Sequence, residues 1–113
     1  MPYIEAKLSV SLNENQKNEL QTKLTDVVSA AFSKPKAYIM AGIEDGISLY
    51  MAEKKTEKGA YVSVSLLGSV TKPACQNLTK SICDILSSYG IDGSNVYVTY
   101  HPVELWGWNG SMF

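Results

Sequence analysis

The same pattern of apolar residues occurs twice in this 113-residue chain, and the two copies lie 58 positions apart. The offset carries apolar positions of the first half onto apolar positions of the second: Ile4, Ala6 and Leu8 onto Val62, Val64 and Leu66, and Leu20, Leu24, Val27, Val28 and Ala31 onto Leu78, Ile82, Ile85, Leu86 and Tyr89. Each copy starts with the alternation of a half-buried strand and continues with the spacing of an amphipathic helix. Such self-similarity indicates a duplicated unit within one domain, residues 1–113.

The predicted elements follow in the order strand, helix, strand, twice. In the first unit we expect a strand within residues 1–10, a helix that starts at the capping-box pair Asn13 and Gln16 and stops at Lys34-Pro35, and a buried strand over 38–43. In the second unit we expect a strand over 61–67, a helix over 73–89 capped by Gly90, and a strand over 96–100. Between the units lie a short extra strand over 47–51 and a charged, solvated loop over 53–59.

Two strand–helix–strand units of this length predict an α+β fold, because each crossover helix joins two parallel strands. The expected architecture is an α/β plait of the ferredoxin-like, split βαβ type, with a four-stranded sheet and both helices on one face. The other face stays uncovered and mixes polar with aromatic residues: Tyr3, Glu5, Lys7, Tyr61, Ser63, Ser65, Leu67, Tyr97 and Thr99. A symmetric oligomer that encloses this face around a wet channel fits both traits. A monomer with a solvated sheet is the alternative.

Charge and hydropathy exclude several classes of partner. The formal net charge is −1, so nothing indicates binding to nucleic acid or to an anionic membrane. All ten basic residues are lysines, and arginine is the usual bidentate ligand of phosphates and dicarboxylates. No apolar run approaches the roughly 18 residues of a membrane span, and no signal peptide opens the chain. We therefore expect a cytoplasmic protein, with secretion by a leaderless route as the alternative.

The cysteines predict neither a disulfide nor a metal site. Cys75 and Cys83 are separated by eight positions in one predicted helix, which is about 12 Å along its axis and too far for a disulfide. We expect both thiols to be reduced. One histidine beside two cysteines argues against zinc, and no cofactor is predicted.

A proline follows the first methionine of the chain. Because a small second residue normally allows the methionine to be removed, Pro2 would become a free secondary amine at the start of a strand. If Met1 stays, the Pro2 nitrogen is an amide without basicity. The alternative interpretation of Pro2 is a residue merely tolerated at a strand start.

Five segments are informative together: Met1-Pro2, Lys34-Pro35-Lys36-Ala37-Tyr38-Ile39-Met40, Ser65-Leu66-Leu67-Gly68, Val96-Tyr97-Val98 and Gly107-Trp108-Asn109-Gly110-Ser111-Met112-Phe113. In this order and spacing they resemble the macrophage migration inhibitory factor family of tautomerases, over the whole chain. The resemblance implies a homotrimer of βαββαβ subunits with keto–enol tautomerase activity. It also implies active sites between subunits, each built on an N-terminal proline.

The resemblance implies a role for each matching residue. Pro2 is the catalytic base, and Lys34 binds a substrate carboxylate and lowers the pKa of the nearby amine by its charge. Leu67 offers a backbone N–H to the substrate, and Tyr97 comes from the neighbouring subunit. The pocket wall is aromatic: Tyr38, Trp106, Trp108 and Phe113. From the residues alone, Lys34 would be a helix-end lysine favoured by the macrodipole, and the tryptophans would be packing residues.

Three departures from the family pattern change what the resemblance implies. Glu57-Lys58-Gly59-Ala60 replaces the Cys-x-x-Cys motif of the best-known member, so thiol–disulfide oxidoreductase activity is not implied. Thr99 replaces an asparagine that contacts the substrate, which alters one polar contact. The segment 101–106 is shorter than its counterpart and adds Trp106 to the pocket rim.

Together, the residues and the resemblance predict a tautomerase of the phenylpyruvate or dopachrome type that acts on a small aryl-pyruvate-like monocarboxylate. Branches of the superfamily that hydrate or dehalogenate small acids use arginines, which this chain lacks. The alternative is a secreted, cytokine-like mimic that binds a host receptor and keeps only a vestigial enzyme site.

The mixed sheet face predicts a trimer in solution, with a mass of about 37 kDa, three times the 12.4 kDa of one chain. Light scattering at micromolar protein concentration measures this mass directly. A particle with the mass of a single chain would contradict the prediction.

Overall fold

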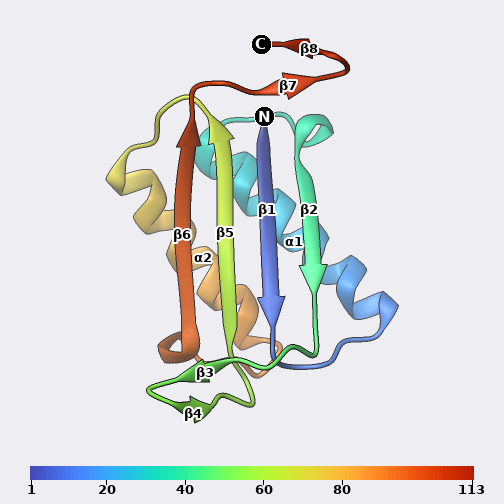
Figure 1. Cartoon of the computed structure of the whole chain (residues 1–113), viewed down its shortest axis with the longest axis vertical. Coiled ribbons are helices and arrows are strands. Elements are labelled where there is room, and N and C mark those ends of the chain that lie inside the picture. Colours follow the sequence, from blue (N-terminus) through green and yellow to red (C-terminus); the bar gives the residue numbers. More distant parts are fainter.

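The computed structural model describes all 113 residues and contains one four-stranded sheet, two α-helices and two small hairpins (Figure 1). The elements are β1 (Pro2–Leu8), α1 (Glu14–Phe32), β2 (Met40–Glu44), β3 (Tyr50–Met51), β4 (Lys54–Lys55), β5 (Ala60–Leu67), α2 (Lys72–Ser87), β6 (Val96–Val103), β7 (Gly107–Trp108) and β8 (Ser111–Met112). Short 3-10 helices cover Lys36–Tyr38 and Gly93–Asn95. Both α-helices lie behind the sheet on the same face, as predicted (Figure 1).

The sheet has the strand order β2-β1-β5-β6. β1 is parallel to β2, β5 is parallel to β6, and the two central strands are antiparallel. The α+β class built from two βαβ units is therefore confirmed. The split, ferredoxin-like order is wrong, because a split unit has a strand of the other unit between its own two strands, and here each unit keeps its strands adjacent.

The two central strands meet with a reciprocal register. Ile4 pairs with Val64, the repeat equivalent of Ala6, and Ala6 pairs with Val62, the repeat equivalent of Ile4. A two-fold axis between two equivalent strands produces this kind of reciprocal pairing. The duplicated sequence thus forms a pseudo-two-fold symmetric sheet.

Most of the core consists of the repeated apolar positions, to which Ala60 and Ile91 are added. Six predicted pairs are buried with no more than 1% exposure: Ile4 and Val62, Ala6 and Val64, Leu8 and Leu66, Leu20 and Leu78, Leu24 and Ile82, Val28 and Leu86. The remaining two pairs are only partly buried and pack against the rim of this core. The period of two along the strands and of about 3.6 along the helices places all twelve buried side chains between the sheet and the helices.

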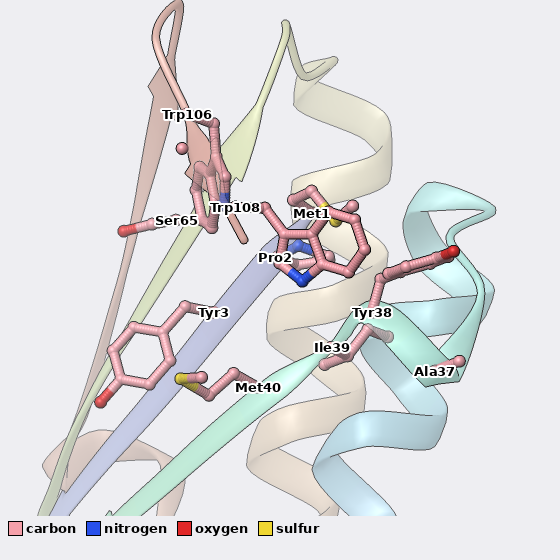
Figure 2. A pocket seen from close by; sticks show the side chains of 11 residues that line it. Met1, Pro2, Tyr3, Ala37, Tyr38, Ile39, Met40, Ser65, Trp106 and Trp108 are labelled. Carbon is pink, nitrogen blue, oxygen red and sulfur yellow. The ribbon is translucent and has the colours of Figure 1, made fainter. Parts of the chain in front are cut away.

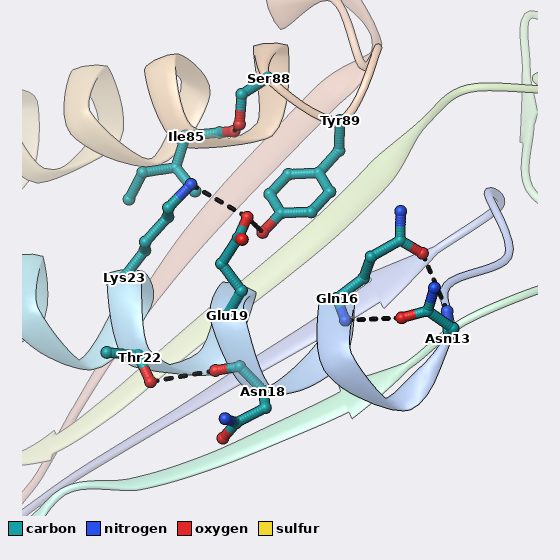
Figure 3. Close-up of polar contacts among 9 residues, drawn as sticks. All are labelled: Asn13, Gln16, Asn18, Glu19, Thr22, Lys23, Ile85, Ser88 and Tyr89. Carbon is teal, nitrogen blue, oxygen red and sulfur yellow. Dashed lines mark hydrogen bonds and ion pairs between the residues drawn. The ribbon is translucent and has the colours of Figure 1, made fainter.

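The ends of α1 follow local sequence signals. Asn13 Oδ1 accepts a hydrogen bond from the Gln16 N–H at 2.8 Å, and Gln16 Oε1 accepts one from the Asn13 N–H at 2.9 Å, which confirms the capping box (Figure 3). The helix ends at Phe32, and Ser33 adopts the left-handed conformation with φ 53°. The chain therefore leaves the helix just before Lys34-Pro35. The α2 helix is shorter than predicted and is capped by Ser88, so the left-handed Gly90 follows the cap.

A polar contact between the helices involves Glu19 of α1 and Tyr89, which follows α2. The Glu19 carboxylate accepts hydrogen bonds from the Tyr89 hydroxyl at 2.7 Å and from Lys23 Nζ at 3.2 Å (Figure 3). Burial and then the Glu19 carboxylate raise the pKa of Tyr89 to about 12. The Tyr89 hydroxyl and Lys23 lower the pKa of Glu19, so donor and acceptor keep their roles through the neutral range.

The strand predicted over 38–43 begins later, at Met40, because the backbone after Pro35 first forms a 3-10 turn. It is also not fully buried. β2 is an edge strand, and the Met40 side chain is 69% exposed. A continuous apolar run indicates burial on two faces, but here the helices cover only one.

The connection between the two units is more ordered than predicted. The short strand expected over 47–51 contains only Tyr50–Met51, and it pairs with Lys54–Lys55 of the expected loop. Ala52 and Glu53 both have positive φ, as the central residues of a type I′ hairpin turn require. The last strand continues to Val103 and includes Pro102, which is tolerated because β6 is the other edge of the sheet.

Truncation of a repeated core residue tests this packing. Leu24→Ala removes a 1% exposed side chain and should lower the free energy of unfolding by about 2–5 kcal/mol. Thr22→Ala, on the exposed side of the same helix, is the matched control and should change it by no more than about 0.5 kcal/mol. Chemical denaturation at one fixed protein concentration measures both; equal effects would place Leu24 outside the core.

Candidate active site

A cavity of about 540 Å³ opens at the start of β1 (Figure 2). The C-terminal hairpin β7–β8 lies next to this strand end (Figure 1). Its lining is mostly apolar and comes from four parts of the chain: Met1, Pro2, Tyr3, Ala37, Tyr38, Ile39, Met40, Ser65, Trp106, Gly107 and Trp108. A cavity of this size, with an apolar lining and a few polar groups, is typical of a small-molecule site.

Pro2 lies buried at the start of β1, opposite Leu66 of β5. The residue before it, Met1, is held by the next residue of β5, since the Leu67 N–H donates to the Met1 carbonyl oxygen at 3.3 Å. The Leu67 side chain does not line the cavity, but its N–H points to the chain end beside Pro2. With Met1 present, this donor is therefore occupied by the chain itself.

The N-terminal amine is close to a cation. Burial, and then the charge of Lys34, lower the pKa of this amine below its ordinary value of 8.0. Lys34 forms no salt bridge, whereas the next lysine, Lys36, pairs with Asp26 at 2.7 Å. The half-buried Lys34 thus leaves one uncompensated positive charge near the chain end, which favours an anionic ligand.

The aromatic wall is organised around Trp108 of the C-terminal hairpin. The rings of Tyr38 and Trp108 meet edge to face at 6.0 Å, and those of Trp108 and Phe113 stack at 5.9 Å. The Phe113 N–H donates to the Trp106 carbonyl oxygen at 3.0 Å, which closes the hairpin. Phe113 therefore stacks on Trp108 without lining the cavity. Tyr38, Trp106 and Trp108 line the cavity directly (Figure 2).

Two predicted site residues lie elsewhere. Tyr97 pairs with Tyr61 and lines a separate cavity of about 240 Å³ next to the β3–β4 hairpin, at the opposite end of the sheet. Thr99 Oγ1 shares hydrogen bonds with the Tyr61 hydroxyl at 2.7 Å and with His101 Nε2 at 2.8 Å. Tyr97 is level with Lys7, five residues or about 17 Å along β1 from Pro2, and Thr99 is level with Glu5, three residues or about 10 Å along. Both also lie two strands away on β6, so neither is next to Pro2 within one chain.

Comparison with known proteins identifies the family. The model of the macrophage migration inhibitory factor family matches residues 1–113. The chain is 31% identical over 97 residues to macrophage migration inhibitory factor of Xenopus laevis, covering 83% of this chain and 84% of that protein. The macrophage migration inhibitory factor homologue from Prochlorococcus marinus superposes with a TM-score of 0.89 at 27% identity and covers 98% of both chains.

The chain belongs to the macrophage migration inhibitory factor (MIF) family. The fold agrees throughout, since MIF2 of Leishmania major superposes with a TM-score of 0.92 over 100% of this chain and 97% of that one, at 24% identity. The resemblance predicted from five short segments is therefore confirmed.

In this MIF-family chain the fold gathers Pro2, Tyr38, Trp106 and Trp108 directly around one cavity. It also brings in residues that the sequence did not predict for the site: Met1, Tyr3, Ala37, Ile39, Met40, Ser65 and Gly107. Tyr3 and Ser65 could have been predicted for the site, because both belong to the uncovered sheet face and they pair across β1 and β5. Met40 could not have been predicted for the site, because the sequence assigns it to a buried strand.

The remaining surface shows neither a metal-ligand cluster nor a membrane-spanning helix. No group of three or more His, Cys, Asp or Glu side chains is arranged to hold a metal ion. None of the helices has the length and apolar character needed to cross a bilayer. Cys75 and Cys83 are unpaired thiols, and burial raises the pKa of both, which disfavours the reactive thiolate.

Proposed function

We propose that this MIF-family chain is a keto–enol tautomerase of the phenylpyruvate type, with Pro2 as its base. The observation that carries the proposal is the position of Pro2, which opens β1 at an aromatic cavity while the uncompensated Lys34 charge acts on the neighbouring amine. An aryl-pyruvate has complementary parts: a carboxylate for the cation, an aryl group for the wall and a transferable proton beside its carbonyl.

The base requires removal of Met1. In the trimmed chain the amine belongs to Pro2, where burial and Lys34 act in the same direction and favour the neutral form. The neutral Pro2 amine takes a proton from the carbon next to the carbonyl, which gives an enolate and a protonated amine. The protonated amine then gives its proton to the enolate oxygen and is neutral again. The reverse steps convert enol to ketone, so the reaction is a proton transfer that needs no cofactor.

Removal of Met1 would also release a hydrogen-bond donor. The Leu67 N–H that now binds the Met1 carbonyl would become free beside the new N-terminus. An N–H aimed at the site of a developing enolate oxygen stabilises that charge without reorganisation. One processing event would thus create the base and free the donor together.

Tyr97 and Thr99 enter this proposal through assembly. Within one chain they lie on β6, two strands from Pro2, with Tyr97 towards the far end of the sheet and Thr99 near the middle of the strand. In this proposal a neighbouring subunit supplies them to the Pro2 cavity. Tyr97 is 67% exposed in the single chain, as expected of a residue that awaits a partner. The fused 4-OT, a structural neighbour at 19% identity and a TM-score of 0.84, is a symmetric trimer.

A second neighbour supports the choice of a 2-oxo acid. Pt0534, at 18% identity and a TM-score of 0.85, is inactivated by 2-oxo-3-pentynoate. We extend the preference for this ligand class to the present cavity because its aromatic wall suits an aryl group. Lys34 does not line the cavity, but its charge acts on the chain end beside it and suits a carboxylate. The alternative function, receptor binding after leaderless secretion, needs neither a free amine nor turnover, and the experiments below separate the two.

Lys34→Ala tests the carboxylate contact. The variant should lose about 10-fold or more in kcat/KM on phenylpyruvate, because a charge-assisted contact of roughly 1.5–3 kcal/mol is removed. On the methyl ester, wild type and variant should differ much less. An equal loss on acid and ester would mean that Lys34 acts mainly by tuning the amine.

Pro2 variants test the base. Pro2→Gly and an alanine inserted between Met1 and Pro2 should both lower turnover by about 10²–10⁴-fold while the far-UV spectrum stays unchanged, because a general base is displaced or lost. The glycine variant keeps an N-terminal amine and should be damaged less. The kcat/KM of wild type should rise with pH through a Pro2 amine pKa lower than that of an ordinary N-terminal amine, since only the neutral amine is a base and we expect burial and Lys34 to act on Pro2 as they do on the Met1 amine. Full activity in protein whose intact mass proves that Met1 is retained would contradict the mechanism.

A further inference from the structure

The backbone turn that carries Lys34 has an unusual conformation. Ser33, just before it, adopts the left-handed conformation with φ 53° and ψ 45°, a position at which helices commonly use glycine. A side chain at such a position costs conformational energy, so the surrounding contacts must hold the turn.

One residue makes those contacts. The Ser29 carbonyl accepts hydrogen bonds from the Ser33 N–H and, at 3.1 Å, from the Lys34 N–H, while the Ser29 hydroxyl donates to the Lys34 carbonyl oxygen at 2.6 Å. Both peptide groups of Lys34 are therefore held by Ser29. The rigid Pro35 follows at once, and the next residue, Lys36, is paired with Asp26.

The hydrogen bond of the Ser29 hydroxyl is not the one that a serine in a helix usually makes. A serine inside a helix usually donates back to the carbonyl of the preceding turn. Ser87, which lies 58 positions further and is the repeat equivalent in α2, does this and donates to the Asp84 carbonyl oxygen at 2.7 Å. The Ser29 hydroxyl instead donates forward, past the end of α1, to the carbonyl oxygen of Lys34, whose side chain forms no salt bridge.

We propose that Ser29 is a positioning residue for Lys34 and thereby sets the preference of the cavity for carboxylates. The inference rests on the proposed function, in which Lys34 binds the substrate carboxylate. A lysine has a long flexible stem, so its ammonium is directed only if the backbone beneath it is fixed. Without the Ser29 hydroxyl, the backbone bonds to the Ser29 carbonyl remain but the Lys34 carbonyl loses its partner. The Lys34 backbone is then less restrained, and its ammonium samples positions farther from the amine.

The test compares Ser29→Ala, Ser29→Thr and Ser87→Ala with wild type. Ser29→Ala should raise the KM for phenylpyruvate about 5- to 10-fold, the effect of about one hydrogen bond, while kcat changes less than about twofold. The methyl ester should be turned over almost as by wild type. Ser29→Thr keeps a hydroxyl and should restore the KM, and Ser87→Ala should behave as wild type in both assays. Equal losses on acid and ester, or no loss on either, would overturn the inference.

A second readout does not depend on turnover. NMR titration of the N-terminal amine should show a higher amine pKa in Ser29→Ala than in wild type, because the Lys34 charge no longer stays close to it. If wild type fails to turn over phenylpyruvate, the proposed function fails, and this titration still decides the role of Ser29. An amine pKa unchanged from wild type in Ser29→Ala, with Lys34→Ala shifted, would show that Ser29 does not position Lys34.

Discussion

The antiparallel pairing of β1 with β5 is the interaction on which the rest of the structure depends. It joins the two strand–helix–strand units through a reciprocal register, so both helices pack on the same face and the repeated apolar residues form one core. The same register places the first residues of β1 opposite the last residues of β5. A β-hydrogen-bond ladder therefore fixes the N-terminus, which is mobile in many proteins, as part of a rigid sheet.

The candidate site is a consequence of this arrangement. Because β2 runs parallel to β1, the turn with Lys34 and Tyr38 lies beside the start of β1. Because β6 runs parallel to β5, the C-terminal hairpin leaves the sheet at the same end and covers the chain start (Figure 1). Segments distant in sequence thus converge at one sheet end, and the site combines a strand terminus, a helix-end turn and an aromatic hairpin. The Ser29 contacts fix the backbone of Lys34, the cation that acts on the N-terminal amine and forms no salt bridge.

Part of the site was predictable and part was not. Tyr38, Trp106 and Trp108 were assigned from family resemblance and do line the cavity, whereas Phe113 stacks on Trp108 and does not line it. The occupation of the Leu67 N–H by the Met1 carbonyl follows only from the register of two strands far apart in sequence. The separation of Tyr97 and Thr99 from Pro2 likewise follows from strand direction, and it makes assembly a requirement of the proposed site.

The sequence by itself determined the class of fold and the composition of the core. Period-two and helical periodicity depend on local geometry, so each repeated apolar position could be assigned to a face before any contact was known. Only the tertiary structure decided that each unit keeps its two strands adjacent, that β2 is an exposed edge, and that Met40 and Tyr3 face a ligand cavity. These features depend on which strands pair, and strand pairing is settled by the cooperative packing of the whole core, which no local pattern encodes.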